Sequence, residues 1–202
     1  MRKLVILFAA VLSATVGYSQ NGSEVLGAMA EKIGAMGTYR IDFELEMPSA
    51  TATSIGYCLV HGERYVIAIE DMSQGSDGTV VWAVNTTNQE ITLDEPRPKS
   101  RSLFDNPTKA FDFAEELFVV ESAESQAQGV WSLSLLPQKG VLDGIERVEV
   151  WVDSKSNLPI RLGYDMAGVG LVVNIRSLVP AEFSDKEFAV PSVEGFEVID
   201  FR

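Results

Sequence analysis

The chain has 202 residues, 46% of them hydrophobic, and a formal net charge of −13. Such an acidic surface repels nucleic acid and anionic lipid headgroups, which argues against proteins that bind either through basic patches. The length suits one domain with a substantial core, and a single cysteine, Cys58, leaves no internal disulfide to stabilise it.

The chain begins with the pattern of a secretory signal peptide. A short positive segment precedes an apolar run over residues 4–16, and Gly17 and Ser19 are small residues at the positions that signal peptidase reads. The run is too short to span a bilayer comfortably. We predict cleavage after Ser19 and export of residues 20–202 to the periplasm as one soluble domain.

Residues 23–36 predict an amphipathic helix that Gly37 ends. Its apolar side chains recur at spacings of three and four, which places them on one face: Leu26, Met29, Ala30, Ile33 and Met36. Plain core packing produces the same spacing. The methionines and glycines of the segment would make this helix easy to repack against a changing neighbour.

Alternating apolar residues then predict five strands with short connections. In the first, residues 38–47, the acidic side chains Asp42, Glu44 and Glu46 share one face. We interpret them as a solvated face and not as a metal site, because alternate strand residues lie ~7 Å apart. Strands over residues 54–61 and 64–70 follow, and a polar loop over 71–75 leads to a hairpin.

The hairpin over residues 76–94 has the clearest pattern. A tight turn is predicted at Asp77-Gly78, and turn-forming residues 85–88 separate two strands. The apolar residues of these strands alternate, so they share one face: Val80, Trp82, Val84, Ile91 and Leu93.

Asn106 and Pro107 predict the start of a second helix, over residues 107–117. Further strands are predicted over residues 117–122, 129–136, 144–153, 158–164 and 170–178, and a phenylalanine-rich tail ends with 196–201. The fold class is therefore mainly β with a helical lid. We expect an antiparallel, unclosed β-barrel (a half-barrel of about ten to eleven strands) covered by short helices.

The apolar strand faces exceed what two helices can cover. Ten strands spaced ~4.8 Å apart make a sheet ~48 Å wide, whereas each helix is ~10 Å across. Either a closed barrel fills itself with side chains, or an open one keeps helices as a lid over a hydrophobic cavity. A bare patch of this size would aggregate in a monomer, and the helices bearing Met and Phe favour the open form.

Residues for catalysis or metal binding are scarce. A single histidine, His61, and a single cysteine cannot form a zinc site, and no Gly-x-Ser-x-Gly motif presents a serine. We expect a monomer that is not an enzyme and has no metal and no cofactor. Glu115 and Glu116 fit a solvated helix face, and a pair of glycosidase carboxylates stays open as the alternative.

Several short motifs occur in a recognisable order behind the export signal. They are a DG-x-x-x-W-x-x-N hairpin, an Asn-Pro helix start, a Leu-x-Pro-x-x-Gly run and a Val-Ile-Asp ending, carried by Asp77, Gly78, Trp82, Asn85, Leu135, Pro137 and Gly140 among others. In this order the chain resembles the periplasmic outer-membrane lipoprotein carrier family, LolA, over essentially the whole mature length.

The resemblance implies an unclosed β-barrel with helical lids that shields lipoprotein acyl chains. It also implies two partners, an inner-membrane lipoprotein-releasing transporter and an outer-membrane acceptor. Family members carry an arginine after the second strand that latches the lid, and Arg64 is its nearest counterpart here. In the family this arginine is often followed by proline. Here the segment reads His-Gly-Glu-Arg-Tyr, so Arg64 departs from the family pattern.

We predict that ten strand residues line the lipid site: Phe43, Leu45, Tyr57, Leu59, Ile67, Trp82, Val84, Leu93, Leu133 and Val150. The predicted lid residues are Met29, Ile33, Phe111 and Phe113. Three alternatives to a carrier stay open: a free-lipid binder or lipoprotein sensor of envelope stress, an enzyme using Glu115 and Glu116, and a filled barrel that serves as an interaction module.

Overall fold

The computed structural model describes residues 21–47, 52–97, 107–109, 111–113, 115–139, 144–166 and 168–202. The predicted signal peptide and its cleavage site lie outside the described residues. An α-helix covers residues 21–34, and two shorter helices are η1 (Pro107–Lys109) and α2 (Asp185–Phe188). The strands are β1 (Thr38–Glu46), β2 (Ser54–His61), β3 (Arg64–Ile69), β4 (Met72–Ser76), β5 (Val81–Asn85), β6 (Glu90–Asp94), β7 (Phe118–Gln126), β8 (Val130–Pro137), β9 (Arg147–Asp153), β10 (Leu158–Met166), β11 (Val169–Pro180) and β12 (Glu197–Asp200).

These strands form one sheet in the order β12-β6-β5-β4-β3-β2-β1-β11-β10-β9-β8-β7. Because β12 and β7 are its two edges, the sheet does not close on itself within the described residues. The predicted fold class, mainly β with an unclosed antiparallel sheet and short helices, is confirmed. One pair departs from it: β12 runs parallel to β6, because the long segment between α2 and β12 first carries the chain back across the sheet.

The chain divides into two compact units. The first comprises Met1–Lys32 and Phe113–Leu171, and the second comprises Ile33–Asp112 and Val172–Arg202. That residues 20–202 act as a single domain stays a prediction.

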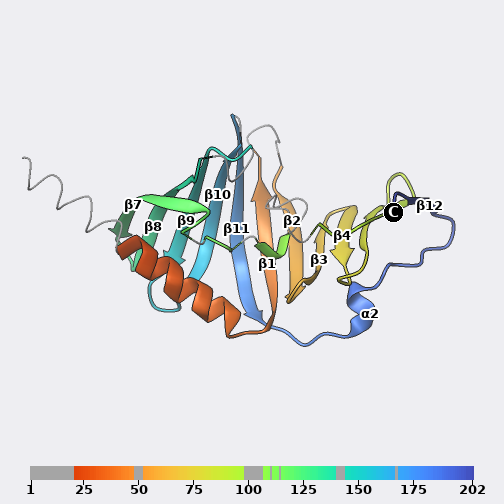
Figure 1. Cartoon of the computed structure of the whole chain (residues 1–202), viewed down its shortest axis with the longest axis horizontal. Helices are drawn as coiled ribbons and strands as arrows, with labels where there is room; N and C mark the ends of the chain where they lie inside the picture. Colours follow the sequence, from red (N-terminus) through yellow and green to blue (C-terminus); the bar gives the residue numbers. More distant parts are fainter. Residues whose placement is uncertain are drawn as a thin grey trace, which may run out of the picture. The chain divides into compact units, whose positions relative to one another are not determined.

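In the first unit, the helix of residues 21–34 crosses one face of the β7–β10 sheet (Figure 1). A Cβ atom on Gly22 would lie 2.6 Å from Cγ1 of Val120, so the helix begins in close contact with β7. Leu26 and Met29 are buried, as is one continuous set of strand residues: Ala123, Leu133, Leu135, Val148, Val150, Val152, Leu162 and Tyr164. Leu133 pairs with Val150 across β8 and β9, which places both in this core.

The predicted second helix is wrong beyond its first turn. Among the described residues of this segment, Pro107–Lys109 alone is helical, and residues 111–113 and 115–117 are irregular or turns. Phe111 and Phe113 are nonetheless both buried. Residues two apart on a helix point about 200° away from each other, so a helix covered on one face would not bury both phenylalanines, whereas an irregular chain can. Phe113 packs edge-on against Phe118 with 5.7 Å between ring centroids.

The second unit contains the predicted hairpin, now β5 and β6, and the turn before it. Gly78 has φ +93°, and the Asp77 carboxylate accepts hydrogen bonds from the backbone of Thr79 at 2.7 Å and Val80 at 2.9 Å. Partial burial raises the pKa of Asp77, but the hydrogen bond from the Thr79 hydroxyl, together with the backbone hydrogen bonds, outweighs it and leaves the pKa below its ordinary value.

A strand, β4, replaces the polar loop predicted before the hairpin. Its sequence, MSQGS, lacks apolar alternation, but the space above Gly75 holds the Trp82 indole. A Cβ atom on Gly75 would lie 2.3 Å from Cζ2 of Trp82. The absence of a side chain therefore lets β4 pass beneath the ring and pair with both β3 and β5.

Candidate functional site

The strand register divides the side chains of the second unit between two faces of its sheet. Residues directly opposite each other on paired strands point to the same side. One set, which we call the Phe43 face, contains Tyr39, Ile41, Phe43, Leu45, Cys58, Val60, Tyr65, Ile67, Ile69, Met72, Val173 and Ile175. The other, the Trp82 face, contains Tyr57, Leu59, Val66, Trp82, Val84, Ile91 and Leu93.

The ten residues predicted to line one surface are therefore not brought together. Phe43, Leu45 and Ile67 lie on the Phe43 face. Five others lie on the opposite face: Tyr57, Leu59, Trp82, Val84 and Leu93. Leu133 and Val150 belong to the core of the first unit. Alternation shows which residues of one strand share a face, but the pairing register decides which face that is.

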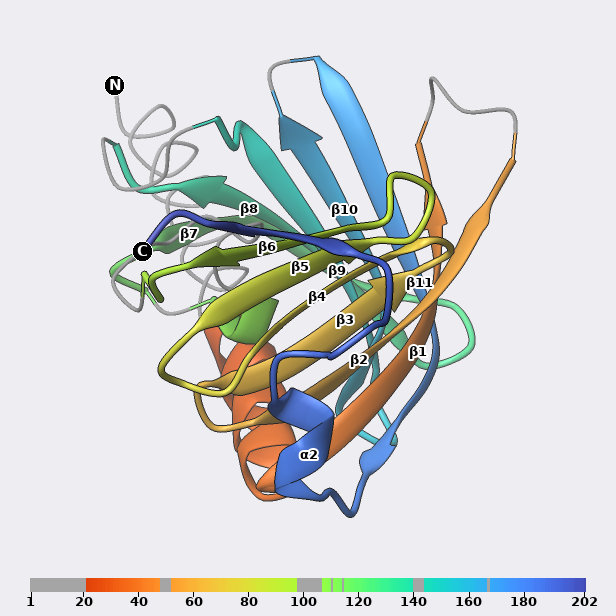
Figure 2. The same ribbon diagram turned by 90° about the vertical axis from the view of Figure 1, so that its right-hand side faces the viewer.

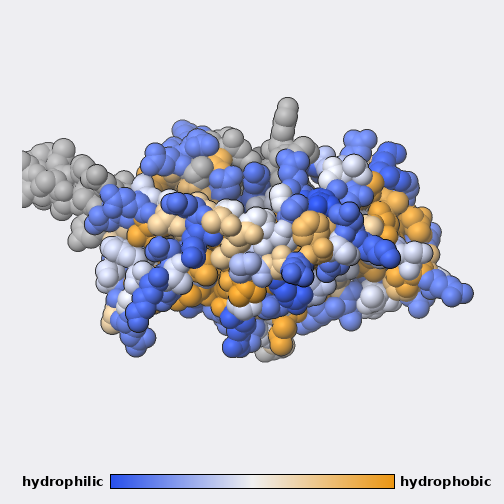
Figure 3. All heavy atoms as spheres, turned by 90° about the horizontal axis from the view of Figure 1, so that it is seen from below, coloured by the Kyte–Doolittle hydropathy of each residue, from blue (hydrophilic) through white to orange (hydrophobic). Residues whose placement is uncertain are grey.

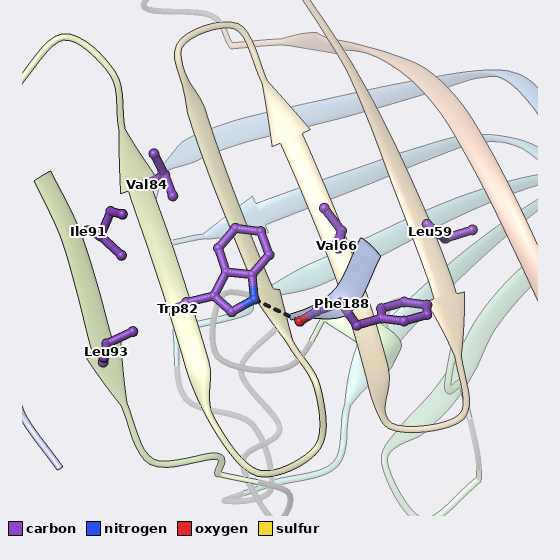
Figure 4. Close-up of a cluster of buried hydrophobic side chains, with 7 residues drawn as sticks. All are labelled: Leu59, Val66, Trp82, Val84, Ile91, Leu93 and Phe188. Carbon is purple, nitrogen blue, oxygen red and sulfur yellow. Dashed lines mark hydrogen bonds between the residues drawn. The ribbon is translucent and has the colours of Figure 1, made fainter. Parts of the chain in front are cut away.

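The Trp82 face is packed by the chain's own C-terminal segment, residues 181–202. Figure 4 shows the indole nitrogen of Trp82 donating a hydrogen bond of 2.9 Å to the backbone oxygen of Phe188. The ring of Phe188 has no exposed surface, and Ala181, Phe183 and Phe196 pack against the same cluster. Figure 2 shows this segment, with α2, lying in front of the strands of the hairpin and its neighbours.

Arg64 contacts this C-terminal segment. Its Nη1 donates to Oδ1 of Asp185 at 2.7 Å, and its guanidinium carbon lies 5.0 Å from the ring centroids of Phe183 and Phe188. Because Asp185 is highly exposed, the stacked rings stabilise the contact more than the ion pair does. Arg64 thus joins β3 to α2, and a role in latching a lid stays a prediction.

The single histidine is part of the same contact. The His61 ring lies 4.2 Å from the Phe183 ring, and its Nδ1 is 2.6 Å from Oγ1 of Thr38. The side chain therefore packs against the C-terminal segment and is not directed at a carboxylate or a serine. Glu115 and Glu116, the other catalytic candidates, are exposed in a turn and not on the predicted helix face.

The Phe43 face is well covered at one end. Ile41, Phe43 and Cys58 are each less than a tenth exposed, and burial raises the pKa of the Cys58 thiol to about 12. The thiol therefore stays protonated and acts as a small apolar side chain. Phe43 lies across β2, because a Cβ atom on Gly56 would lie 2.7 Å from its Cζ.

The same face becomes progressively exposed toward the other end of its strands. Leu45 pairs with Val173, Phe43 with Ile175, and Ile69 with Met72, so the apolar surface continues across neighbouring strands. Met72 is 60% exposed. We call this surface the apolar patch and define it by six residues that are half-buried or exposed: Leu45, Ile67, Ile69, Met72, Val173 and Ile175.

The predicted lipid lining includes Leu45 and Ile67 of this patch but not its other four residues. Val173 and Ile175 alternate along a predicted strand, but nothing in the sequence shows that this strand pairs with β1. Met72 falls in a segment that the sequence predicts as a loop. The four predicted lid residues, Met29, Ile33, Phe111 and Phe113, are all buried, and their displacement by a ligand stays a prediction.

The acidic residues of β1 form ion pairs and hydrogen bonds with residues of β1 and β11. Arg40 and Ser177 each donate to Asp42 at 2.8 Å, Arg176 pairs with Glu44, and Asn174 donates to Glu46 at 2.7 Å. Within the described ranges, no group of three or more His, Cys, Asp or Glu side chains could hold a metal ion. Asp42 pairs with Tyr57 and Glu44 with Ile55, so these carboxylates lie at the β1 end of the Trp82 face. They are half-buried or exposed there, which agrees with the predicted solvated face.

Asp42 gives a testable pH dependence. The hydrogen bond from Arg40 lowers the pKa of Asp42; partial burial opposes this, and Ser177 adds to it. Because the pKa of Asp42 is lower in the folded state, its carboxylate stabilises the protein at pH values above the unfolded-state pKa of ~3.9. This contribution is lost as the pH falls through the folded-state pKa. In urea denaturation below pH 4, Asp42→Asn should therefore show a shallower loss of stability than the unchanged protein.

The matched control for Asp42→Asn is Glu31→Gln. Glu31 is an exposed carboxylate on the helix of residues 21–34 and has no ion pair among the described residues. The Glu31→Gln variant should show the same pH dependence of stability as the unchanged protein. Equal slopes for the unchanged protein and Asp42→Asn would contradict the assignment.

Comparisons with known proteins identify the fold but no established activity. No family model and no curated protein matches the chain. Its structure is similar to the crystal structure of an uncharacterized conserved protein from Thermus thermophilus, with a TM-score of 0.58 and 7% identity over 89% of this chain and 99% of that one. At that identity, the likeness shows a shared fold alone.

Two further solved structures have lower scores. An outer membrane lipoprotein-sorting protein domain from Vibrio parahaemolyticus has a TM-score of 0.48 and 13% identity, covering 84% of this chain and 97% of that one. A LolA superfamily protein from Nitrosomonas europaea has a TM-score of 0.43 and 11% identity, covering 85% and 97%. The solved structures similar to this chain thus include the family that its sequence resembles, at TM-scores too low to carry an argument about activity.

No helix among the described residues is both long enough and apolar enough to cross a membrane.

Proposed function

We propose that this chain is a periplasmic carrier that shields lipoprotein acyl chains on the Phe43 face during transport toward the outer membrane. The observation that carries the proposal is the apolar patch. The Trp82 face is packed by the C-terminal segment and the core of the first unit is buried, whereas the patch continues an apolar face that the described residues cover incompletely. Exposed apolar surface of this kind marks sites for apolar ligands or partners.

The free energy of binding suits reversible transfer. Burying one methylene contributes about 0.8 kcal/mol, so complete burial of three chains of ~15 methylenes would exceed the practical limit of reversible affinity. The Phe43 face changes from buried at Phe43 to exposed at Met72, so it covers a chain only in part. Partial coverage keeps affinity moderate, which a carrier needs if it is to release its cargo to an acceptor.

The resemblance to the LolA family favours lipoproteins over free lipids as cargo. The proposal therefore includes an inner-membrane lipoprotein-releasing transporter as donor and an outer-membrane acceptor as recipient. The proposed role of Arg64 is limited to its contact with the C-terminal segment, because it lies on the Trp82 side of the sheet with Phe183 and Phe188.

The test is a charge introduced into the patch. Leu45→Glu should weaken binding of a fluorescent fatty acid and of a triacylated lipopeptide by at least about tenfold, because a bound acyl chain would desolvate the carboxylate at a cost above ~1.4 kcal/mol. Binding is measured by fluorescence titration, and folding is checked by circular dichroism.

Ile55→Glu is the matched control. Ile55 is 70% exposed, and it pairs with Glu44 on the other face of the same strands. Binding should be unchanged in this variant. Equal losses in both variants, or no binding by the unchanged protein, would refute the proposed site. Binding of the fatty acid without the lipopeptide would instead favour the free-lipid alternative, and capture without transfer to acceptor membranes would favour a lipoprotein sensor.

A further inference from the structure

Some apolar side chains of the C-terminal segment are packed against the sheet, and others are exposed. Phe183, Phe188 and Phe196 pack on the Trp82 face, and the Trp82–Phe188 hydrogen bond holds the segment in place. Four other apolar residues of the same segment are between 36% and 67% exposed: Val190, Val193, Val198 and Phe201. Figure 3 shows hydrophobic atoms gathered at the right-hand end of the molecule, where Figure 1 places β12 and the C terminus.

Strand β12 also presents an unpaired backbone edge. Within the described residues, β6 is its only hydrogen-bonded neighbour. The N–H of Glu197 donates to the backbone oxygen of Gln89, just before β6, and the N–H of Phe201 donates to that of Leu93 in β6, each at 2.9 Å. Since strand backbone groups alternate in direction, the N–H groups of Val198 and Asp200 point away from β6, where another strand could pair with them.

Carboxylates lie in this strand and just before it in the chain. Asp200 is paired with Arg202, but the exposed side chains of Glu194 and Glu197 have no ion pair among the described residues. The other edge of the sheet, β7, differs in that a register irregularity interrupts its pairing between Val120 and Ser122. Irregular pairing of this kind protects an edge from a second strand, so β12 is the better docking edge.

We propose that β12 is a docking site for an extended segment of a partner protein that carries both apolar and basic residues. The segment adds a strand beside β12, its backbone pairs with Val198 and Asp200, and its basic residues face Glu194 and Glu197. The backbone supplies affinity in this recognition mode and the side chains supply selectivity. The inference is independent of the acyl-chain site, which lies on other strands.

The test uses an eight-residue peptide of alternating valine and lysine, compared with one of alternating valine and glutamate. Fluorescence anisotropy with the full chain should show binding of the lysine peptide only. Glu197→Lys should weaken it about threefold to tenfold and should create binding of the glutamate peptide, because the charge pair beside the added strand is reversed. Val198→Thr should weaken it about twofold to fivefold.

Two controls separate docking from general attraction to an acidic protein. Glu31→Lys makes the same charge change on the helix, and Ile55→Thr makes the same apolar-to-polar change at an exposed strand residue; neither should alter binding. Bound peptide should also slow hydrogen exchange at the amides of Val198 and Asp200. Equal losses in Glu197→Lys and Glu31→Lys, or no added protection at these amides, would overturn the proposal.

Membrane contact is the other outcome that would overturn it. If phosphatidylcholine vesicles bind through Val198 and Phe201 while the two peptides bind equally or not at all, then the exposed residues serve a lipid surface and not a protein strand.

Discussion

Trp82→Ala is expected to lower the free energy of unfolding by about 3–5 kcal/mol, because it removes the largest side chain of a buried cluster. The indole is only 3% exposed, and it fills the space above Gly75. The variant also leaves the backbone oxygen of Phe188 without its donor. Urea denaturation measures the loss, and faster hydrogen exchange over residues 189–202 should accompany it.

Trp82→Phe is the graded control. It keeps an aromatic ring beside Gly75 but cannot donate to Phe188, so the expected loss is about 1–2 kcal/mol. Neither variant should weaken acyl-chain binding by the protein that remains folded, since Trp82 and the apolar patch lie on opposite faces. A stable Trp82→Ala protein with weakened lipid binding would return Trp82 to the lipid site and contradict the register.

The contrast between Trp82 and Leu45 shows what the sequence can and cannot predict. Both residues belong to strands with clear apolar alternation, and alternation alone places both in one lining. Between their strands, however, lies β4, whose residues Ser73, Gln74 and Gly75 carry no alternation. The strands between them and their pairing register determine which face of the sheet the apolar residues of each strand occupy. Because the sequence does not predict β4 or the register, it cannot show that Trp82 and Leu45 lie on opposite faces.

Other parts of the fold are predictable because their signals are local. The β1 pattern, with acidic side chains opposite Phe43 and its neighbours, and the turn at Gly78 need no distant contact to be recognised. The second helix is not predictable for the opposite reason: Asn106-Pro107 favours a helical start, but burial of Phe111 and Phe113 depends on tertiary packing. The parallel pairing of β12 likewise depends on where the C-terminal segment crosses the sheet.

Val150→Asp is expected to destabilise the protein by more than about 4 kcal/mol, because it buries an unpaired carboxylate. Val150 has no exposed surface and pairs with Leu133 on one side and Leu162 on the other. Ile160→Asp, on the neighbouring strand, makes a similar change at a side chain that is 39% exposed, and should cost no more than about 1 kcal/mol. Urea denaturation compares the two variants.

Val150→Ala distinguishes a packed core from a lipid lining at this position. Removing two methyl groups from a filled core should cost about 2–3 kcal/mol and leave a folded protein whose acyl-chain affinity can be measured. If Val150 is core, then that affinity is unchanged, and of these two variants Leu45→Glu alone weakens binding. If Val150→Ala is nearly as stable as the unchanged protein but binds acyl chains several-fold more weakly, then the ligand reaches the first unit, and the site must extend beyond the apolar patch.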